Sequence, residues 1–522
     1  MDSLAAYNDQ RATLIAQDRA LRRDHAATTS AAERKAAEYI KCLRTEESAS
    51  VWGSEHEGVL HPFPGMEFLN GKSIIDKTKL FKVVSKMPKG ALLHAHLDAT
   101  VDFRTVLSLA LQYPALHVRA AERLTSSNLG SVLPEFRALP KEEHPISDVS
   151  LTDANYVANT WAPLKTAREC FLGGPAAFDA WAIAAATINP SEAYQTHNTV
   201  DKIWEKFTST FLVSTGLIRF APIWEQYIHQ FLRSSVEDGI SYVEVRINFY
   251  PRYMYSAEGH EDVPHTVWLE IFDTTLKRFK EELKQEGRED EFVGARIIYS
   301  TLRIITPEEL EFYCEDCIAL KQAFPHLIAG FDLVGAENVL KPLIYYAETL
   351  LRFRKRVEEL GMDIPFILHA GETTGDGTEA DMNLYDAILL GTKRIGHGFS
   401  VVKHPKLLSL CRERGILLEV CPISNEILRL TSSMPMHPLP IMMNNGVPVA
   451  LSSDDPAMFG NMGLSYDFYQ VLVSSEVTGL ISLRELARDG ILHSTLAEED
   501  KEMCLRLWTK RWNKFIDWVV TL

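Results

Sequence analysis

The sequence is poor in cysteine and contains no long apolar run. Seven cysteines in 522 residues are few and odd in number, which argues against a disulfide framework. No apolar stretch reaches the roughly 18 residues of a membrane-spanning helix. The N-terminus, "MDSLAAYNDQRATLIAQDRALRRDH", lacks the continuous apolar core of a secretory signal. These absences favour a globular protein that neither spans a membrane nor depends on disulfides.

A basic excess is also absent. The formal net charge is −16, which disfavours nucleic acid or an anionic membrane as a partner. No Asn-x-Ser/Thr glycosylation acceptor is usable, because Pro190 blocks the one candidate. We therefore expect a cytoplasmic protein with a small-molecule ligand. If a leader had been removed, the protein would instead be secreted.

Residues 1–80 are predicted to form an N-terminal helical extension. Their first 50 residues are rich in Ala, Glu, Lys and Arg, with apolar side chains at roughly helical spacing. A narrow stripe of this kind packs on the body of the chain or on a partner subunit, and we expect homodimerisation through it. The stripe comprises Leu14, Ile15, Leu21, Ala36, Tyr39, Ile40 and Leu43.

From residue 91 onward, short apolar runs alternate with helical patterns. Eight runs that can be buried on both faces predict a parallel, closed (β/α)8 barrel within residues 81–522. The interval between the first two runs is much the longest, and residues 112–200 are predicted to be an insertion after the first strand. The runs are "ALLHAH" (91–96), "SYVEVRIN" (241–248), "ARIIYSTL" (295–302), "LIAGFDLV" (327–334), "IPFILHA" (364–370), "KRIGHG" (393–398), "ILLEVCP" (416–422) and "VPVALSSDD" (447–455).

Two histidines, His94 and His96, lie two positions apart in the first run. Side chains at this spacing on a strand point the same way, so both rings can face the mouth of a barrel. With 17 histidines in 522 positions, such a pair often arises by chance and is weak evidence alone. Other polar residues strengthen it, because they also fall at the C-terminal ends of runs, where barrel active sites are assembled. They are His369, Glu372, His397, Asp454 and Asp455.

Three imidazoles and one carboxylate form a zinc site that leaves room for a water molecule. We expect His94, His96, His369 and Asp454 to hold one Zn²⁺ per chain. Zinc lowers the pKa of its water, a nearby histidine can take the proton, and a carboxylic acid can protonate the group under attack. The candidates for these roles are His397 and Glu372, with Asp455 placed to orient the water or to bind substrate.

Three glycines flank these residues, namely Gly371, Gly396 and Gly398. Glycine lets the backbone approach a ligand closely, so Gly371 is a candidate for substrate binding, although glycines in tight turns are equally common. A cytidine-deaminase-type site is excluded, because the sequence lacks both His-x-Glu and Pro-Cys-x-x-Cys. From the residues alone, the prediction is metal-assisted hydrolysis in a barrel, with the substrate undetermined.

The motifs "MPKGALLHAHLD", "GFDLVG", "LHAGE", "IGHG", "CPISN" and "SSDDP" occur in this order. Together they resemble the adenosine deaminase family of the amidohydrolase superfamily, most closely its adenosine deaminase-related growth factor branch. The resemblance implies zinc-dependent deamination of a 6-aminopurine nucleoside or nucleotide. It also implies that Glu372 protonates the purine N1, that His397 assists addition of water at C6, and that Asp455 meets N7 and the water.

The same resemblance implies further contacts with substrate. Gly335 would meet the purine N3 through its backbone, Asp98 would bind the sugar, and Trp204 would lie near the sugar. The residues after Asp98 are Ala99 and Thr100, where ordinary adenosine deaminases have Gly-Ala, so the sugar end of the site is expected to differ.

Adenosine and AMP both remain candidate substrates, because residues of the insertion could bind a phosphate. These are Lys165, Arg168, Lys202 and Lys206. Two other functions remain open. One is a growth-factor-like signalling or binding protein with incidental deaminase activity, as the name of the branch suggests, and the other is an amidohydrolase acting on another aminopurine.

Overall fold

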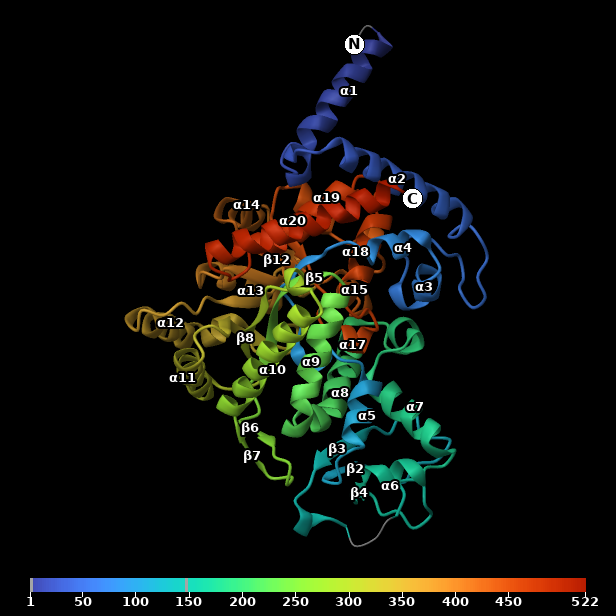
Figure 1. Ribbon diagram of the computed structural model, residues 1–522, viewed down its shortest axis with the longest axis vertical. Coiled ribbons are helices and arrows are strands. Elements are labelled where there is room, and N and C mark those ends of the chain that lie inside the picture. Colours follow the sequence, from blue (N-terminus) through green and yellow to red (C-terminus); the bar gives the residue numbers. More distant parts are fainter. Residues whose placement is uncertain (1–2, 146–148) are drawn as a thin grey trace.

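Eight parallel strands close into a barrel at the centre of the molecule (Figure 1). The computed structural model describes residues 3–145 and 149–522, so residues 1–2 of the predicted extension and 146–148 of the predicted insertion lie outside the description. Two four-stranded sheets are joined by bridges between Ala95 and Asp454 and between Phe331 and Phe366. The predicted (β/α)8 fold is confirmed. Its strands are β1 (Gly90–Leu92), β5 (Ile240–Asn248), β8 (Gly294–Leu302), β9 (Ile328–Val334), β10 (Ile367–Ala370), β11 (Arg394–His397), β12 (Leu417–Val420) and β13 (Val449–Leu451).

Helices cover the outside of the barrel, because each crossover between parallel strands needs a long connection. They shield strands that are buried along nearly their whole length, such as β5 and β9. The helices after β5 are α10 (His265–Gln285), α11 (Pro307–Ala323), α12 (Leu343–Glu359), α13 (Glu379–Leu389), α14 (Pro405–Arg414), α15 (Pro422–Ile427), α16 (Leu439–Asn444), α17 (Pro456–Phe459), α18 (Ser465–Val473), α19 (Leu480–Leu492) and α20 (Glu498–Val520).

The first strand is shorter than predicted. Regular pairing of β1 with β5 ends at Leu92, whereas the apolar run continues to His96. Beyond Leu92 the chain keeps one bridge to β5, where the Arg246 amide donates to the Ala95 carbonyl at 2.9 Å. It also pairs with the segment after β13, since the His96 amide donates to the Asp454 carbonyl at 3.1 Å and the Asp454 amide donates to the His94 carbonyl at 3.1 Å. This second pairing closes the barrel and brings the His-x-His pair beside Asp454.

The predicted N-terminal stripe divides into two parts. Helix α1 (Leu4–Asp18) buries none of its residues and projects from the body of the molecule (Figure 1). Helix α2 (Ala31–Ser50) packs on the same chain, with Ala36, Ile40 and Leu43 buried against α19 and α20. Helices α3 (Phe68–Ile75) and α4 (Lys79–Val84) follow before the barrel begins. The stripe of α2 therefore serves the fold of its own subunit.

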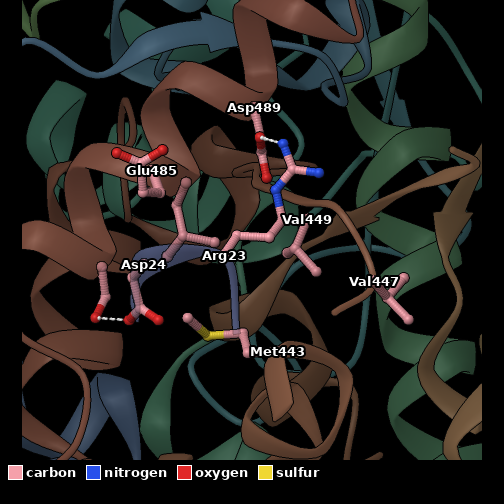
Figure 2. Close-up of a pocket in the computed structure, with 9 residues that line it drawn as sticks. Arg23, Asp24, Met443, Val447, Val449, Glu485 and Asp489 are labelled. Carbon is pink, nitrogen blue, oxygen red and sulfur yellow. Dashed lines mark hydrogen bonds and ion pairs between the residues drawn. The ribbon is translucent and has the colours of Figure 1, made fainter. Parts of the chain in front are cut away.

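The turn between α1 and α2 is anchored by charge on α19 (Figure 2). Arg23 Nη2 donates to Asp489 Oδ1 at 2.7 Å, and Ser482 Oγ donates to Asp24 Oδ2 at 2.5 Å. These pairs border a small cavity of about 20 Å³ that Met443 also lines. The N-terminal segment is thus joined to the barrel at the end opposite to the insertion.

The chain between β1 and β5 forms the other extremity of the molecule (Figure 1). Its strands make a small antiparallel sheet in the order β3-β2-β4. Gly216 of α8 lies directly over β3, where a Cβ atom would come within 1.7 Å of the Phe136 carbonyl oxygen, so only glycine fits. The elements are α5 (Phe103–Ala110), β2 (Leu116–Ala120), β3 (Pro134–Ala138), β4 (Ala162–Pro163), α6 (Leu164–Glu169), α7 (Gly174–Ala186), α8 (Val200–Ile218) and α9 (Ala221–Glu237), and the hairpin β6 (Tyr253–Tyr255) and β7 (Glu261–Pro264) follows β5.

Two further properties concern the chain as a whole. Among the described residues, no helix combines the length and the apolar character that crossing a membrane requires. All seven cysteines are free, and only Cys42 and Cys170 are exposed.

A buried carboxyl group connects the insertion, the N-terminal helices and the barrel. Glu426 on α15 accepts hydrogen bonds at Oε2 from the Phe68 amide at 3.0 Å and from the Tyr194 hydroxyl at 3.1 Å. Burial raises the pKa of Glu426 to about 8. Because the folded state holds this proton more tightly than the unfolded state, the contribution of Glu426 to stability declines as the pH rises from about 4.5 to about 8.

We predict that Glu426→Gln makes the protein more stable in alkaline solution. A neutral amide keeps the acceptor oxygen and removes the cost of ionising a buried group. The free energy of unfolding in urea should rise by about 1–3 kcal/mol near pH 9 and change little near pH 5. The exposed Glu57→Gln serves as control and should leave both values unchanged. Equal effects of Glu426→Gln at the two pH values would contradict the prediction.

Candidate active site

Three imidazoles and a carboxylate converge at the C-terminal mouth of the barrel. Ring nitrogens of His94, His96 and His369 lie within 4.8 Å of one another. Asp454 Oδ1 is 3.3 Å from His94 Nε2 and 3.3 Å from His96 Nε2. The structure therefore brings together the four residues that the sequence predicts as metal ligands, and it does so at the C-terminal end of the strands, as expected for a barrel enzyme.

The chemistry of these residues fits a divalent metal ion. His94 Nε2 and Asp454 Oδ1 are buried, and neither has a hydrogen-bond partner among the described residues. Buried polar atoms are rarely left without a partner, and these two face each other. Three neutral nitrogen donors and one carboxylate oxygen are also a donor set that zinc prefers.

Two carboxylates behind the histidines orient them, and the sequence analysis missed both. Glu419 Oε2 lies 2.8 Å from His94 Nδ1, and Asp332 Oδ2 lies 2.7 Å from His369 Nδ1. Each carboxylate accepts the Nδ1 proton, which leaves Nε2 free to bind a metal. The signal was present in the sequence, because "GFDLV" and "ILLEV" each place a charged residue in the middle of a fully buried strand.

Glu372 and His397 lie beside the histidine cluster, each almost completely buried. Burial and then the charge of Asp454 raise the pKa of Glu372 well above its usual value, which favours the protonated form of this carboxyl. Burial lowers the pKa of His397 well below its usual value. His397 Nε2 lies 3.5 Å from Glu372 Oε1. A carboxyl group that burial shifts toward its protonated form and an imidazole that burial shifts toward its neutral form therefore lie side by side. Such a pair can protonate a substrate and hydrogen-bond a water molecule.

The pKa values of the adjacent carboxyl groups of Asp454 and Asp455 are shifted in opposite directions. Burial alone would raise the pKa of Asp454, but His397 and His94 hold it well below its usual value. Burial and then the charge of Asp454 raise the pKa of Asp455. Ser424 Oγ donates to Asp454 Oδ2 at 2.7 Å, which fixes the orientation of Asp454. The pair thus supplies one ionised ligand and one separate carboxyl group that faces the cavity.

A cavity of about 890 Å³ opens above the cluster and lies within the size range of small-molecule sites. Its lining includes the predicted contacts Asp98, Trp204 and Gly335, together with the proposed catalytic residues. Trp204 belongs to α8, so the wall on that side comes from the chain inserted between β1 and β5. Gly335, at a φ of 116°, turns the backbone at the end of β9.

The predicted contact of Gly371 with substrate stays a prediction. Gly371 does not line the cavity, and its amide donates to Glu337 Oε2 at 3.2 Å. A Cβ atom at this position would come within 2.8 Å of the Leu384 side chain, which lies on α13. Glycine is needed here for the turn after β10, with a φ of 75°, and for the close packing of α13.

Comparison with known proteins assigns the chain to a family. The family model described as adenosine deaminase matches residues 181–509. The chain belongs to the adenosine deaminase family. The resemblance read from the ordered motifs is thereby confirmed, and the chain is a deaminase.

Similarity extends over the whole length of the family member from Homo sapiens. Adenosine deaminase 2 of Homo sapiens is 32% identical, over 99% of this chain and 95% of that protein. Among solved structures, N6-mAMP deaminase of Arabidopsis has a TM-score of 0.55 at 15% identity, over 82% of this chain and 99% of that one. An amidohydrolase from Burkhoderia ambifaria with bound Zn has a TM-score of 0.53 at 16% identity, over 85% and 95% of the two chains. The structural neighbours share the barrel fold.

We predict that Asp332→Asn weakens metal binding by about 10–100-fold, since an amide cannot accept from both the His369 ring and its backbone as the carboxylate does. Competition between the purified protein and a chromophoric chelator for Zn²⁺ measures the change. The exposed Asp363→Asn, just before β10, is the matched control and should bind as the wild type does. Unchanged affinity in a folded Asp332→Asn protein would show that Asp332 does not orient the ligand.

Proposed function

We propose that the protein is a zinc-dependent adenosine deaminase that converts adenosine and water to inosine and ammonia. The observation that carries the proposal is the buried Glu372 carboxyl beside a cluster of three imidazoles and Asp454, in the cavity of a barrel from this family. His94, His96, His369 and Asp454 would hold Zn²⁺. The zinc bound by the amidohydrolase neighbour, which has the same fold, supports this choice of ion.

The protein side chains supply the remaining chemistry. Bound zinc would make a water molecule acidic enough to attack near neutral pH. Glu372 donates its proton to N1 of the purine, which makes C6 electrophilic. The water oxygen then bonds to C6 and one water proton passes to the amino group, so that the C6–N bond breaks and ammonia leaves. The proton that remains on the new oxygen returns to Glu372, which leaves the C6 carbonyl of inosine. Asp455 lies at the same end of the cavity, where its carboxyl can accept a proton from the water or hydrogen-bond N7 of the purine.

The charges around the cavity favour a nucleoside over a nucleotide. Only two cationic side chains, Arg219 and Arg252, appear among the described lining residues. Arg219 is bonded to Glu261, and Arg252 stacks on the Phe312 ring at 4.1 Å. Asp98 is one of six carboxylates in the lining and lies where a sugar is expected. A phosphate group entering here would therefore meet more carboxylates than cations.

The four basic residues suggested by the sequence as phosphate donors do not line the cavity. Arg168 makes a two-bond pair with Asp179, and Lys206 bonds the Ala184 carbonyl and pairs with Glu192 at 3.2 Å. Lys165 and Lys202 are exposed away from the lining. The structure therefore does not support phosphate binding by these residues.

We predict that kcat/KM for adenosine exceeds that for AMP by about 100-fold or more, because the carboxylates of the lining, Asp98 among them, outnumber its cations and repel a phosphate. Loss of adenine-ring absorbance with zinc-loaded protein measures turnover for adenosine, AMP, ADP, ATP and adenine. Equal rates with AMP would contradict the nucleoside preference. Absence of turnover with the whole panel would contradict the proposed function.

We further propose that the protein forms a homodimer through α1. This helix buries no residue, and its side chains Leu4, Tyr7 and Leu14 are 75%, 50% and 67% exposed. An isolated helix of about 15 residues is marginally stable in water, so α1 needs a surface to pack on. A second copy of the chain would supply that surface.

Removal of residues 1–18 is predicted to convert the dimer to a monomer without lowering the melting temperature, because α1 makes no contribution to the core of its own subunit. Light scattering at micromolar concentration measures the mass, and calorimetry measures the melting temperature. The triple change Leu4→Ser, Tyr7→Ser and Leu14→Ser keeps the full length and should act in the same way. A wild-type protein that is monomeric would contradict the proposal.

A further inference from the structure

A chain of buried hydrogen bonds ends on the ring of His397. The Leu439 amide donates to His437 Nδ1 at 3.0 Å. His437 Nε2 lies 3.1 Å from Asn425 Oδ1, and Asn425 Nδ2 lies 3.1 Å from His397 Nδ1. All three side chains are at most 3% exposed, so water does not compete for these bonds. Neither Asn425 nor His437 lines the cavity.

The direction of every bond in this chain is set by its first donor. A backbone amide can only donate, so His437 Nδ1 is an acceptor and carries no proton. The single proton of the neutral His437 ring is then on Nε2, and burial, which lowers the pKa of His437 to about 3, keeps the ring neutral. The group of Asn425 that faces His437 must therefore be its carbonyl oxygen.

The amide of Asn425 transmits this direction to the active site. With its oxygen toward His437, its NH₂ group faces His397 and donates to Nδ1. His397 Nδ1 is thus an acceptor, and the proton of the neutral His397 ring must lie on Nε2. Reversing the Asn425 amide would place two donors, its NH₂ group and His437 Nε2–H, opposite each other and is excluded.

From this geometry, and given the proposed function, we infer that Asn425 and His437 are positioning residues that fix His397 as a hydrogen-bond donor. His397 Nε2–H points into the cavity, 3.5 Å from Glu372 Oε1 and 3.8 Å from Asp454 Oδ2. This N–H group donates a hydrogen bond to the oxygen that adds to C6, and the bond orients that oxygen. His397 does not remove a proton from the water, because its one vacant nitrogen, Nδ1, is occupied by Asn425.

With His397 as a donor, another group must accept the proton of the attacking water. An imidazole that holds its proton on the side of the substrate stabilises negative charge developing on an oxygen, as donors aimed at a reacting oxygen do. A carboxylate must then accept the proton from water, and Asp455, whose Oδ1 has no partner among the described residues, is the group placed for it. The water thus gives its oxygen to C6 and a proton to a carboxylate, while Glu372 protonates N1.

The first test reads the position of the proton directly. NMR of zinc-loaded protein with ¹⁵N-labelled histidine distinguishes a protonated from a vacant ring nitrogen, and the signals of His397 are those lost in His397→Gln. We expect a protonated Nε2 and a vacant Nδ1. A protonated Nδ1 with a vacant Nε2 overturns the inference. This result does not depend on turnover, so it stands apart from failure of the proposed function.

The second test separates a donor from a base by activity. A glutamine amide can donate a hydrogen bond toward the cavity but cannot act as a base, whereas leucine can do neither. If His397 is a donor, kcat of His397→Gln should exceed that of His397→Leu by about 10-fold or more, with KM within about 3-fold. Equal loss of kcat in the two variants overturns the inference.

The third test reverses the chain at Asn425. In Asn425→Asp, a carboxylate accepts from both rings, so the NMR signal of His397 Nδ1 should become that of a protonated nitrogen. Glu413→Gln, an exposed change on α14, is the control and should leave the ring signals unchanged. A vacant Nδ1 in a folded Asn425→Asp protein would contradict the role of Asn425.

Discussion

The guanidinium of Arg246 holds together the groups on which the whole site depends. Its Nε donates to Asp332 Oδ2 at 2.8 Å, and its Nη2 donates to Glu419 Oε2 at 2.8 Å. These two carboxylates in turn orient His369 and His94. All of these side chains are fully or almost fully buried, so removing one partner of a pair would leave an uncompensated charge at a cost of about 3–5 kcal/mol. A single side chain therefore links two histidines of the candidate metal site from opposite sides of the barrel.

The network of buried ion pairs continues below Arg246, where negatively and positively charged side chains alternate. Arg394 Nε donates to Glu419 Oε1 at 2.6 Å, and Arg394 Nη2 donates to Glu244 Oε2 at 2.7 Å. Three buried carboxylates and two guanidiniums leave the interior of the barrel with one net negative charge. With the ionised Asp454 added, the lower half of the site favours a divalent cation, because a positive ion there compensates charge that burial would otherwise make costly.

Much of this structure could be predicted from the sequence, because the eight strands are short apolar runs and the residues of the candidate site follow them at their C-terminal ends. Asp332 and Glu419 were missed because the role of a buried carboxylate can be inferred only when its partner is known. Their partner, Arg246, is far away in the sequence. The chain from Leu439 to His397 was beyond prediction for another reason. It depends on an irregular segment after α15, whose path no periodic pattern describes. The stripe of residues 1–50 predicted packing, but the pattern could not say that α2 packs on its own subunit.

Two residues of the candidate site, His397 and Asp454, have a strained backbone that surrounding contacts must stabilise. His397 and Asp454 both have a φ of 60°, a left-handed conformation that costs a residue other than glycine about 1–3 kcal/mol. At His397 this turn sends the ring across the mouth of the barrel, and Gly396 makes room, since a Cβ there would lie 2.9 Å from His94 Cε1. A strained backbone persists only where surrounding contacts over-determine it. The hydrogen bond from Asn425 to His397 is such a contact. The same bond therefore fixes the position of the His397 proton and stabilises the left-handed backbone that places its ring.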